Sequence, residues 1–243
     1  MPSAGRLYVV ATPIGNLGDI TGRAQRTLAE VEVVAAEDTR RTRQLLSHLG
    51  LSKKLLRCDE AKEAEAAETI LPILAEGRSV ALATDAGTPS LSDPGHRLVD
   101  RVLRAGYTVV PIPGPSAVTT LLSVCGFSIR DFHFYGFLPK KSGQRRKLLE
   151  YITTAAGASV FFEAPHRISR VLAELAELSG SRMACVGREL TKIHEEILRG
   201  SLTDVAAAFS SRSPRGEFTV VIAPSTKEEI RSRRREQRST MAE

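Results

Sequence analysis

Four short turns in the first half of the sequence concentrate glycine, proline, carboxylate and hydroxyl groups. They read ATPIGNLGD (11–19), AAEDTR (35–40), ATDAGTP (83–89) and PIPGPSA (111–117). A glycine permits a positive φ and lets a ligand approach the backbone closely, whereas a proline stiffens a turn and removes an amide donor. Together these residue types are typical of a site that binds a small polar ligand through a few fixed groups.

The glycines follow neither familiar phosphate-binding pattern. G-x-G-x-x-G and G-x-x-x-x-G-K-[ST] are both missing from the sequence, and Pro13, Pro89 and Pro113 remove amides that a pyrophosphate would need. The turns instead favour a ligand with a flat base, a ribose and a polar tail, which is the form of S-adenosylmethionine. Asp85 then has two open roles, because it can pair with an ammonium or ribose of such a ligand or cap its own turn.

Segments with strand and helix patterns alternate around these turns. Apolar and β-branched runs predict strands at 7–12, 33–38, 79–85 and 108–114. The first helix is expected to have Asp19 as its N-cap. Its apolar face is expected to comprise Ile20, Ala24, Leu28 and Val31. The alternation predicts an N-terminal α/β domain, 1–114, with a mainly parallel sheet, and ligands bind such sheets beyond the carboxyl ends of the strands.

Residues 115–225 have a different pattern, which predicts an α+β domain with a mixed sheet. Strand-like runs occur at 132–138 and 158–165, and an amphipathic helix is expected to end at Gly180. Its apolar face is predicted to comprise Ile168, Val171, Leu172, Leu175 and Leu178. The last segment, 226–243, is basic and is expected to be a disordered tail.

The charge of the chain favours a polyanionic partner. The formal net charge is +6 and the pI is about 9.5. Residues 139–147, PKKSGQRRK, carry five cations and no acid, and they follow the aromatic-rich FHFYGFLP. Residues 231–238, RSRRREQR, carry five arginines against one glutamate, which is equally typical of a solvated end.

Other sequence signals argue against metal, disulfide and membrane functions. The three cysteines, Cys58, Cys125 and Cys185, lie far apart, so reduced thiols in a cytoplasmic protein are expected. The five histidines are scattered without metal-ligand spacing, so no metal is expected. No apolar run approaches the ~20 residues of a membrane-spanning helix, and the N-terminus lacks the pattern of a signal peptide.

Seven blocks of sequence, in this order, resemble one family. They are YVVATPIGNLGDIT, AAEDTRRT, ATDAGTPSLSDPG, VVPIPGPSA, YGFLPKK, FFEAPHR and RELTKIHEE, spread over about residues 6–223. They resemble the bacterial ribosomal RNA small subunit methyltransferase I family, a branch of the tetrapyrrole methylase superfamily. The resemblance implies the two-domain α/β fold of class III methyltransferases, with S-adenosylmethionine in the cleft between the domains, and a homodimer. It also implies methylation of a cytidine ribose 2′-hydroxyl in the decoding region of 16S rRNA, within the small ribosomal subunit.

The resemblance also assigns cofactor-binding residues. They lie on three of the turns and on one later strand: Pro13, Gly15, Asp85, Ala86, Gly87, Thr88, Pro89, Ser116, Ala117 and Phe162. Phe162 is expected to close over the adenine, and the EDTR and FFEAPHR blocks are expected to face the substrate. Many relatives have a His-rich stretch near 58–62, where this chain reads CDEAK, and no role is assigned there.

A ribose hydroxyl is a poor nucleophile, and a base within hydrogen-bond reach adds about 10²–10⁴-fold to the rate. The candidate bases are Asp38, Glu163 and His166, together with Glu189. Each also has a structural interpretation: Asp38 can cap the following helix, Glu163 can pair with Arg167, and His166 can simply begin a helix.

Contacts with RNA phosphates are expected from cations near the substrate-facing blocks. They are Arg40, Lys140, Lys141, Arg145, Arg146, Lys147 and Arg167. Phe134 and Tyr135 can stack on splayed bases or pack in the core. Two other functions stay open: methylation of a corrin precursor, whose enzymes show a G-x-G-P-G-D first loop where this chain reads TPIGNLGD, and non-catalytic RNA binding in assembly.

Overall fold

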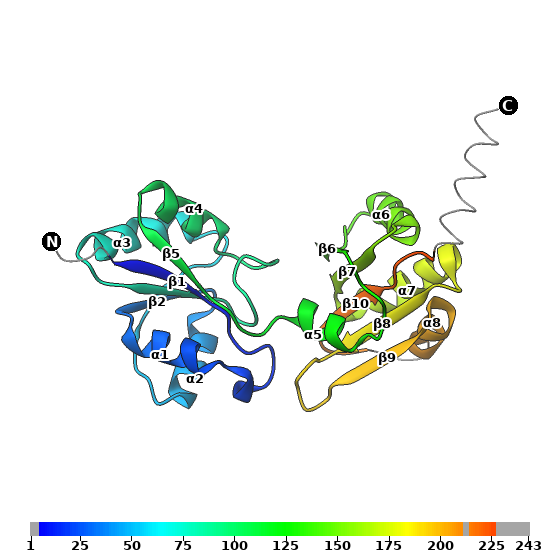
Figure 1. Ribbon diagram of the computed structural model, residues 1–243, viewed down its shortest axis with the longest axis horizontal. Helices are drawn as coiled ribbons and strands as arrows, with labels where there is room; N and C mark the ends of the chain where they lie inside the picture. Colours follow the sequence, from blue (N-terminus) through cyan, green and yellow to red (C-terminus); the bar gives the residue numbers. More distant parts are fainter. Residues whose placement is uncertain (1–4, 211–213, 227–243) are drawn as a thin grey trace. The chain divides into compact units, whose positions relative to one another are not determined.

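The computed structural model describes residues 5–210 and 214–226 of the 243-residue chain (Figure 1). The chain divides into two compact units, Met1–Ala117 and Val118–Glu243. Apart from Thr226, the predicted basic tail lies outside the described residues.

The first unit is built on a parallel sheet with the strand order β3-β2-β4-β1-β5. The strands are β1 (Arg6–Val10), β2 (Val33–Ala36), β3 (Lys54–Arg57), β4 (Val80–Ala83) and β5 (Thr108–Ile112). The helices between them are α1 (Gly22–Glu30), α2 (Thr39–His48), α3 (Glu63–Ala75) and α4 (His96–Arg104). β2 and β4 are buried along their whole length, as expected of strands covered on both faces.

The first helix confirms the predicted apolar face but not the predicted cap. Ile20, Ala24, Leu28 and Val31 are all buried. Asp19 instead lies in a short 3-10 helix, Leu17–Asp19, whose cap is Asn16. The N-cap of α1 is Thr21, whose hydroxyl accepts from the Ala24 amide at 3.1 Å. The prediction of Asp19 was wrong because the chain stays extended at Ile20 and Thr21 before the helix begins.

The helices divide between the two faces of this sheet. α1 and α2 cover one face and α3 and α4 cover the other (Figure 1). β4 lies between β2 and β1, yet the chain leaves β4 toward the α4 face, whereas it leaves both neighbouring strands toward the α1 and α2 face. Such a reversal opens a crevice at the carboxyl ends of the strands, and in α/β sheets this is where ligands bind.

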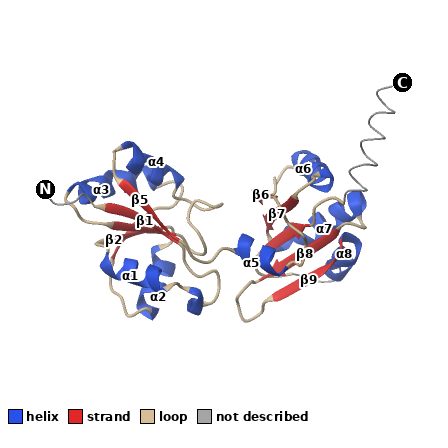
Figure 2. Cartoon of the chain, in the orientation of Figure 1, coloured by secondary structure: helices blue, strands red, loops and turns tan. Residues whose placement is uncertain are grey.

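The second unit contains a mixed sheet, whose strands are red in Figure 2, and the strand order is β6-β7-β10-β8-β9. Its strands are β6 (Phe132–Phe137), β7 (Ala158–Glu163), β8 (Met183–Arg188), β9 (Glu196–Ser201) and β10 (Phe218–Ile222). The helices are α5 (Ala117–Val124), which begins at the boundary of the units, α6 (Ser142–Thr154), α7 (Pro165–Ser179) and α8 (Leu202–Ser210). β6 pairs in parallel with β7 and is an edge strand, and the other pairings are antiparallel.

The amphipathic helix predicted for this unit is α7. The helix ends at Ser179 with Gly180 as its C-cap, as predicted. Four of the five predicted core residues are fully buried, and Leu178 packs partly buried against the same core. The predicted fold class, a mainly parallel sheet followed by a mixed-sheet α+β unit, is confirmed.

A buried carboxylate fixes the start of α4, where the long turn after β4 ends. Glu63 is 1% exposed, and its Oε2 atom accepts from the backbone amides of Arg97 at 2.7 Å and Leu98 at 3.3 Å. The N-cap of α4 is Gly95, which has no side chain to offer. Glu63 therefore supplies the negative charge that favours the positive end of the helix.

Replacing Glu63 with alanine is expected to lower the free energy of unfolding by about 2–3 kcal/mol, because a buried and a partly buried amide lose a charged acceptor. The matched control is Glu65→Ala on the same helix, where a side chain that is 71% exposed forms an ion pair with Lys62. Surface pairs of this kind contribute little, so Glu65→Ala should barely change the midpoint of urea unfolding followed by circular dichroism. Equal losses in the two variants would contradict the capping role.

Candidate functional site

Three of the predicted turns meet at the carboxyl edge of the first sheet. The Thr12 amide donates to the Gly87 carbonyl at 2.9 Å, and the Gly87 amide donates to the Thr12 carbonyl at 3.1 Å. The Thr12 hydroxyl donates to the Thr84 carbonyl at 3.1 Å. The Thr88 hydroxyl donates to the Pro115 carbonyl at 3.2 Å. The turns after β1, β4 and β5 are thus bonded to one another in a fixed arrangement.

The turn after β4 has an unusual backbone. Gly87 has a φ of 85°, and a β-carbon there would lie 3.4 Å from Cγ2 of Ile14. Two non-glycine residues, Ser90 and Ser92, also adopt left-handed angles, at φ values of 69° and 67°. Such residues are uncommon and tend to cluster at ligand sites, so the geometry favours a binding role for this turn.

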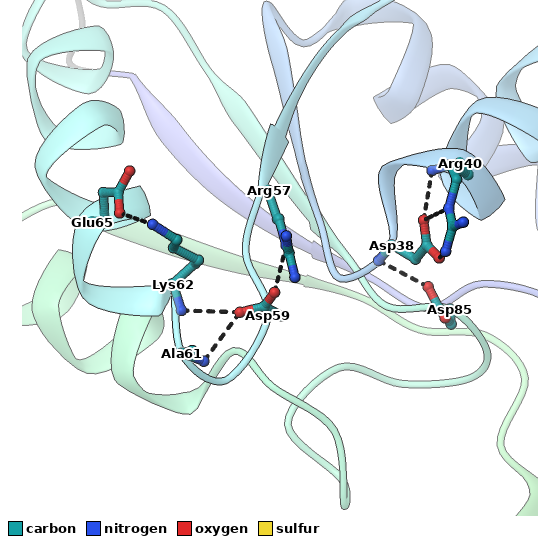
Figure 3. A network of polar contacts seen from close by, with 8 residues as sticks. All are labelled: Asp38, Arg40, Arg57, Asp59, Ala61, Lys62, Glu65 and Asp85. Atoms are coloured by element: carbon teal, nitrogen blue, oxygen red, sulfur yellow. Dashed lines mark hydrogen bonds and ion pairs between the residues drawn. The ribbon is translucent and has the colours of Figure 1, made fainter.

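The turn after β2 is joined to the turn after β4 by two reciprocal hydrogen bonds, which we call the carboxylate clasp. Oδ1 of Asp85 accepts from the Asp38 amide at 3.0 Å, as Figure 3 shows. In return, Oε2 of Glu37 accepts from the Asp85 amide at 3.3 Å. Oδ2 of Asp85 lies 3.4 Å from Nε of the exposed Arg41. Asp85 therefore fixes the neighbouring turn, which neither of its two expected roles described.

Glu37 is the site residue that sequence reasoning did not single out. Burial raises the pKa of its carboxyl group, the hydrogen bond from the Asp85 amide opposes that rise, and the charge of Asp85 reinforces it. Its position directly after a fully buried strand was the sequence signal that could have identified it. A half-buried acid beside a second carboxylate, at a strand end, is a candidate for proton transfer.

Asp38 adopts its structural role as the N-cap of α2. Its Oδ1 accepts from the Arg40 amide at 2.8 Å, and its Oδ2 forms an ion pair with the Arg40 guanidinium at 2.7 Å (Figure 3). Hydrogen bonds from the side chain and the backbone of Arg40 hold the pKa of Asp38 well below its usual range. Asp38 is accordingly a weaker proton acceptor than Glu37.

The CDEAK stretch forms a capped turn before α3. Oδ1 of Asp59 accepts from the amides of Ala61 and Lys62, each at 3.1 Å, and Oδ2 accepts from Nε of Arg57 at 2.5 Å (Figure 3). This turn therefore has a structural role in starting α3.

Of the candidate bases at the start of α7, Glu163 is held by its neighbours and His166 is exposed. Glu163 ends β7 and is 1% exposed, and its Oε1 accepts from the Ala164 amide at 2.8 Å. Its Oε2 lies 3.2 Å from Nη2 of Arg167. Burial raises the pKa of Glu163, and the Ala164 amide and Arg167 oppose that rise. His166 is exposed in the first turn of α7.

Glu189 lies in the turn between β8 and β9, at a φ of 50°. It accepts from the Glu217 amide at 2.9 Å and forms an ion pair with Lys192 at 2.9 Å. These contacts give it a role in fixing the turn.

The predicted RNA-binding cations fall into two groups. Arg145 is 4% exposed and binds both carboxylate oxygens of Glu174, at 3.0 and 2.8 Å. Nη2 of Arg167 donates to two backbone carbonyls on the segment between β6 and α6. The remaining cations are exposed, and they are Arg40, Lys140, Lys141, Arg146 and Lys147. Of these, Arg40 pairs with Asp38, and Arg146 pairs with two surface glutamates.

The predicted cofactor residues of the first unit all lie on the bonded turns. Pro13, Gly87 and Pro89 are buried, Gly15 is exposed, and Asp85, Ala86, Thr88, Ser116 and Ala117 are half-buried. Phe162 belongs to the second unit, where its ring packs against Phe134 and Phe137. Within residues 5–210 and 214–226, no cluster of three or more His, Cys, Asp or Glu side chains is suited to hold a metal ion. In that same part of the chain, no helix is long and apolar enough to cross a membrane.

Comparison with known proteins identifies the class. A model of the family described as Tetrapyrrole (Corrin/Porphyrin) Methylases matches residues 6–206. The solved structure of the methyltransferase CobJ has a TM-score of 0.68 at 20% identity, covering 91% of this chain and 95% of that chain. A uroporphyrin III C-methyl transferase from Thermus thermophilus has a TM-score of 0.64 at 19% identity, covering 94% of this chain and 100% of that chain. The chain thus belongs to the tetrapyrrole methylase family and has its fold.

Relatives in sequence define the family more closely. A ribosomal RNA small subunit methyltransferase I from Neisseria meningitidis is 47% identical over 226 residues, which are 92% of this chain and 78% of the relative. The protein of the same name from Thermotoga maritima is 44% identical over 219 residues, which are 90% of this chain and 98% of the relative. The chain belongs to the ribosomal RNA small subunit methyltransferase I family, which confirms the resemblance of the seven blocks.

The two acids of the turn after β2 are expected to give opposite dependences of stability on pH. The folded-state pKa of Glu37 is raised, so its ionisation disfavours the folded state, and stability falls as the pH rises through that pKa. The folded-state pKa of Asp38 is lowered, so its contribution is present at neutral pH and is lost on acidification below about pH 4.

Glu37→Gln should therefore become more stable relative to the wild type as the pH rises from 4 to 7, whereas Asp38→Asn should become more stable relative to the wild type as the pH falls below about 4. Urea unfolding of the three proteins from about pH 2.5 to pH 7 measures both trends. If the stability of both variants relative to the wild type changed in the same direction with pH, the raised pKa of Glu37 would be contradicted.

Proposed function

We propose that this protein is an S-adenosylmethionine-dependent methyltransferase that acts on ribosomal RNA of the small subunit. The bonded turns at the carboxyl end of β4 carry the proposal, together with identities of 42–47% to relatives named for this activity. The finer proposal is methylation of the 2′-hydroxyl of a cytidine ribose in the decoding region of 16S rRNA. The protein is proposed to act in the cytoplasm as a homodimer, and these last two features rest on the family resemblance alone.

The turns of the first unit fit the proposed cofactor. Oγ1 of Thr84 is buried and has no hydrogen-bond partner among the described residues, so a polar ligand at the end of β4 would satisfy it. Asp85 has one oxygen engaged by the Asp38 amide and the other facing only the exposed Arg41. Such a turn offers a few polar groups on a stiff backbone.

The residues proposed to hold the cofactor are the strand-end residues and one aromatic. They are Pro13, Gly15, Asp85, Ala86, Gly87, Thr88, Pro89, Ser116, Ala117 and Phe162. S-adenosylmethionine supplies an activated methyl group when bound. The contribution of the protein is then to orient the accepting hydroxyl, and orientation alone can lower a barrier by up to about 7–11 kcal/mol.

The accepting hydroxyl must lose its proton as the new bond forms. Asp38, Glu163 and His166 remain candidates for this role, and Glu37 joins them because burial raises the pKa of its carboxyl group. A base with a raised pKa holds a proton more readily near neutral pH than one whose pKa is depressed. Among the two acids of the turn after β2, we therefore favour Glu37 over Asp38.

The exposed cations are proposed to contact RNA phosphates. Lys140, Lys141, Arg146 and Lys147 cluster where β6 passes into α6, and Arg40 lies on the first unit. Arg145 and Arg167 are not part of this proposal, because their guanidinium groups are engaged by Glu174 and by backbone carbonyls. A cobalt precorrin-4 methyltransferase and two uroporphyrin III C-methyltransferases share the fold at 17–20% identity, and this similarity supports the fold only.

Isothermal titration calorimetry should detect S-adenosylmethionine binding at tens of micromolar or tighter. Gly87→Ala is expected to weaken binding about tenfold, because strain at a φ of 85° distorts the turn after β4. Gly106→Ala is the matched control. Gly106 has a φ of 83°, meets nothing within 4 Å and follows α4 at the opposite edge of the sheet, so the strain is similar but the site is untouched. Equal effects of the two variants on binding would argue against a site at this turn.

Small ribosomal subunits from cells that lack this activity should accept a labelled methyl group from the purified enzyme. Digestion and mass spectrometry are expected to place the label on the ribose of one cytidine, because the accepting group is a hydroxyl. Label on a base would contradict the 2′-O assignment but not the proposal that the protein methylates ribosomal RNA. Binding of S-adenosylmethionine without transfer to any ribosomal RNA would favour a non-catalytic role.

A further inference from the structure

The edge strand β6 carries a bulge that changes the direction of its aromatic side chains. Phe134 pairs with Val160 and Phe137 pairs with Phe162, so three steps along β6 match two steps along β7. Gly136 lies within this irregularity at a φ of 62°. A bulge with a left-handed glycine inserts one extra residue and re-aims the side chains that follow.

The aromatic contacts show the result of this insertion. Phe134 and Phe137 are three residues apart and would lie on opposite faces of a regular strand. Both rings nevertheless contact Phe162, with centroid distances of 5.0 and 5.6 Å. The bulge therefore brings Phe137 onto the same face as Phe134, where Phe162 supports it.

Phe137 is the exposed member of this group. Its side chain is 59% exposed, whereas Phe134 and Tyr135 are half-buried and Tyr135 packs against the core of the second unit. Tyr135 thus takes the core-packing alternative of the two that the sequence left open. An aromatic ring that is supported by a neighbouring ring and exposed to solvent offers a surface on which another flat ring can stack.

The buried Arg145 and the half-buried Arg167 hold the backbone that follows Phe137. Nη2 of Arg167 donates to the carbonyls of Leu138 at 2.9 Å and Pro139 at 3.1 Å. Nη1 of Arg145 donates to the carbonyl of Lys140 at 3.3 Å, while its other nitrogens bind Glu174. These contacts leave the ammonium groups of Lys140 and Lys141 exposed within a few residues of the open ring.

We infer that Phe137 is a stacking platform for an unpaired base of single-stranded RNA, with Lys140 and Lys141 placed for the adjoining phosphates. The inference rests on the proposed function and deepens it, because it names the side chain that holds the RNA substrate. An exposed ring beside exposed cations is complementary to single-stranded RNA, in which each base lies next to a phosphate. The exposed ring does not suit a duplex, whose bases are already stacked.

The chain contains no tryptophan, so a single substitution creates a specific fluorescent probe. We expect the fluorescence of Phe137→Trp to be quenched by an unstructured RNA of eight cytidines, because a stacked base quenches indole emission. Phe132→Trp is the matched control, since Phe132 is a 43% exposed aromatic at the other end of the same strand. Its fluorescence should change little.

Affinity measurements separate stacking from general damage. Phe137→Ala should weaken binding of the same RNA by roughly 10- to 100-fold, and Phe137→Tyr should restore most of it. Because Phe137 packs on Phe162, binding of S-adenosylmethionine is measured in both variants, and it should change much less than binding of the RNA. Equal losses in the alanine and tyrosine variants would overturn the inference.

Three outcomes test this inference separately from the proposed function. Normal methylation by Phe137→Trp without quenching by RNA would overturn the platform and leave the methyltransferase intact. Quenching by S-adenosylmethionine alone would also overturn it, by assigning Phe137 to the cofactor. If the wild-type enzyme methylates no ribosomal RNA but the quenching by RNA is seen, the platform stands and the proposed function fails.

Discussion

The position of β4 constrains the whole candidate site. The strand lies between β2 and β1. After β4 the chain crosses to one face of the sheet, whereas after β1 and after β2 it crosses to the other face. The turn after β4 must therefore be held from the side, by the turns next to it. The carboxylate clasp of Asp85 and Glu37 holds it on one side, and the paired amides and carbonyls of Thr12 and Gly87 hold it on the other. The acids, hydroxyls and glycines of these turns therefore have a structural role in addition to any role in binding a ligand.

The second unit uses three arginines as internal supports. Planar guanidinium groups suit carboxylates and carbonyls, and Arg145, Arg167 and Arg182 bind such groups. Arg182, which is 3% exposed, donates to the carbonyls of Thr153, Ala155 and Ala223, while Arg145 and Arg167 fix the segment between β6 and α6. The lysines of that segment remain at the surface. A run of cations in sequence thus separates into supports and exposed charges once it folds.

Several features were predictable because they depend on local periodicity or on recurring sequence blocks. The apolar faces of α1 and α7, the alternation of strands and helices, and the meeting of the turns at one sheet edge all follow from such patterns. Other features were not predictable. Glu63 caps a helix 34 residues away, and no local pattern couples it to the amide of Arg97. The direction of Phe137 depends on a bulge whose register is set by the partner strand.

The sequence by itself determined the family, the order of elements and the composition of the strand-end turns, because these depend on residue type and spacing. Only the tertiary structure decided what each charged group does. It assigned Asp38 to a helix cap, gave Asp85 to the neighbouring turn and raised the pKa of Glu37 through burial. It also buried Arg145 and left Phe137 open. The physical reason is that burial and pairing depend on neighbours distant in the chain, and they shift the pKa of a side chain and set its accessibility in ways that its identity alone does not determine.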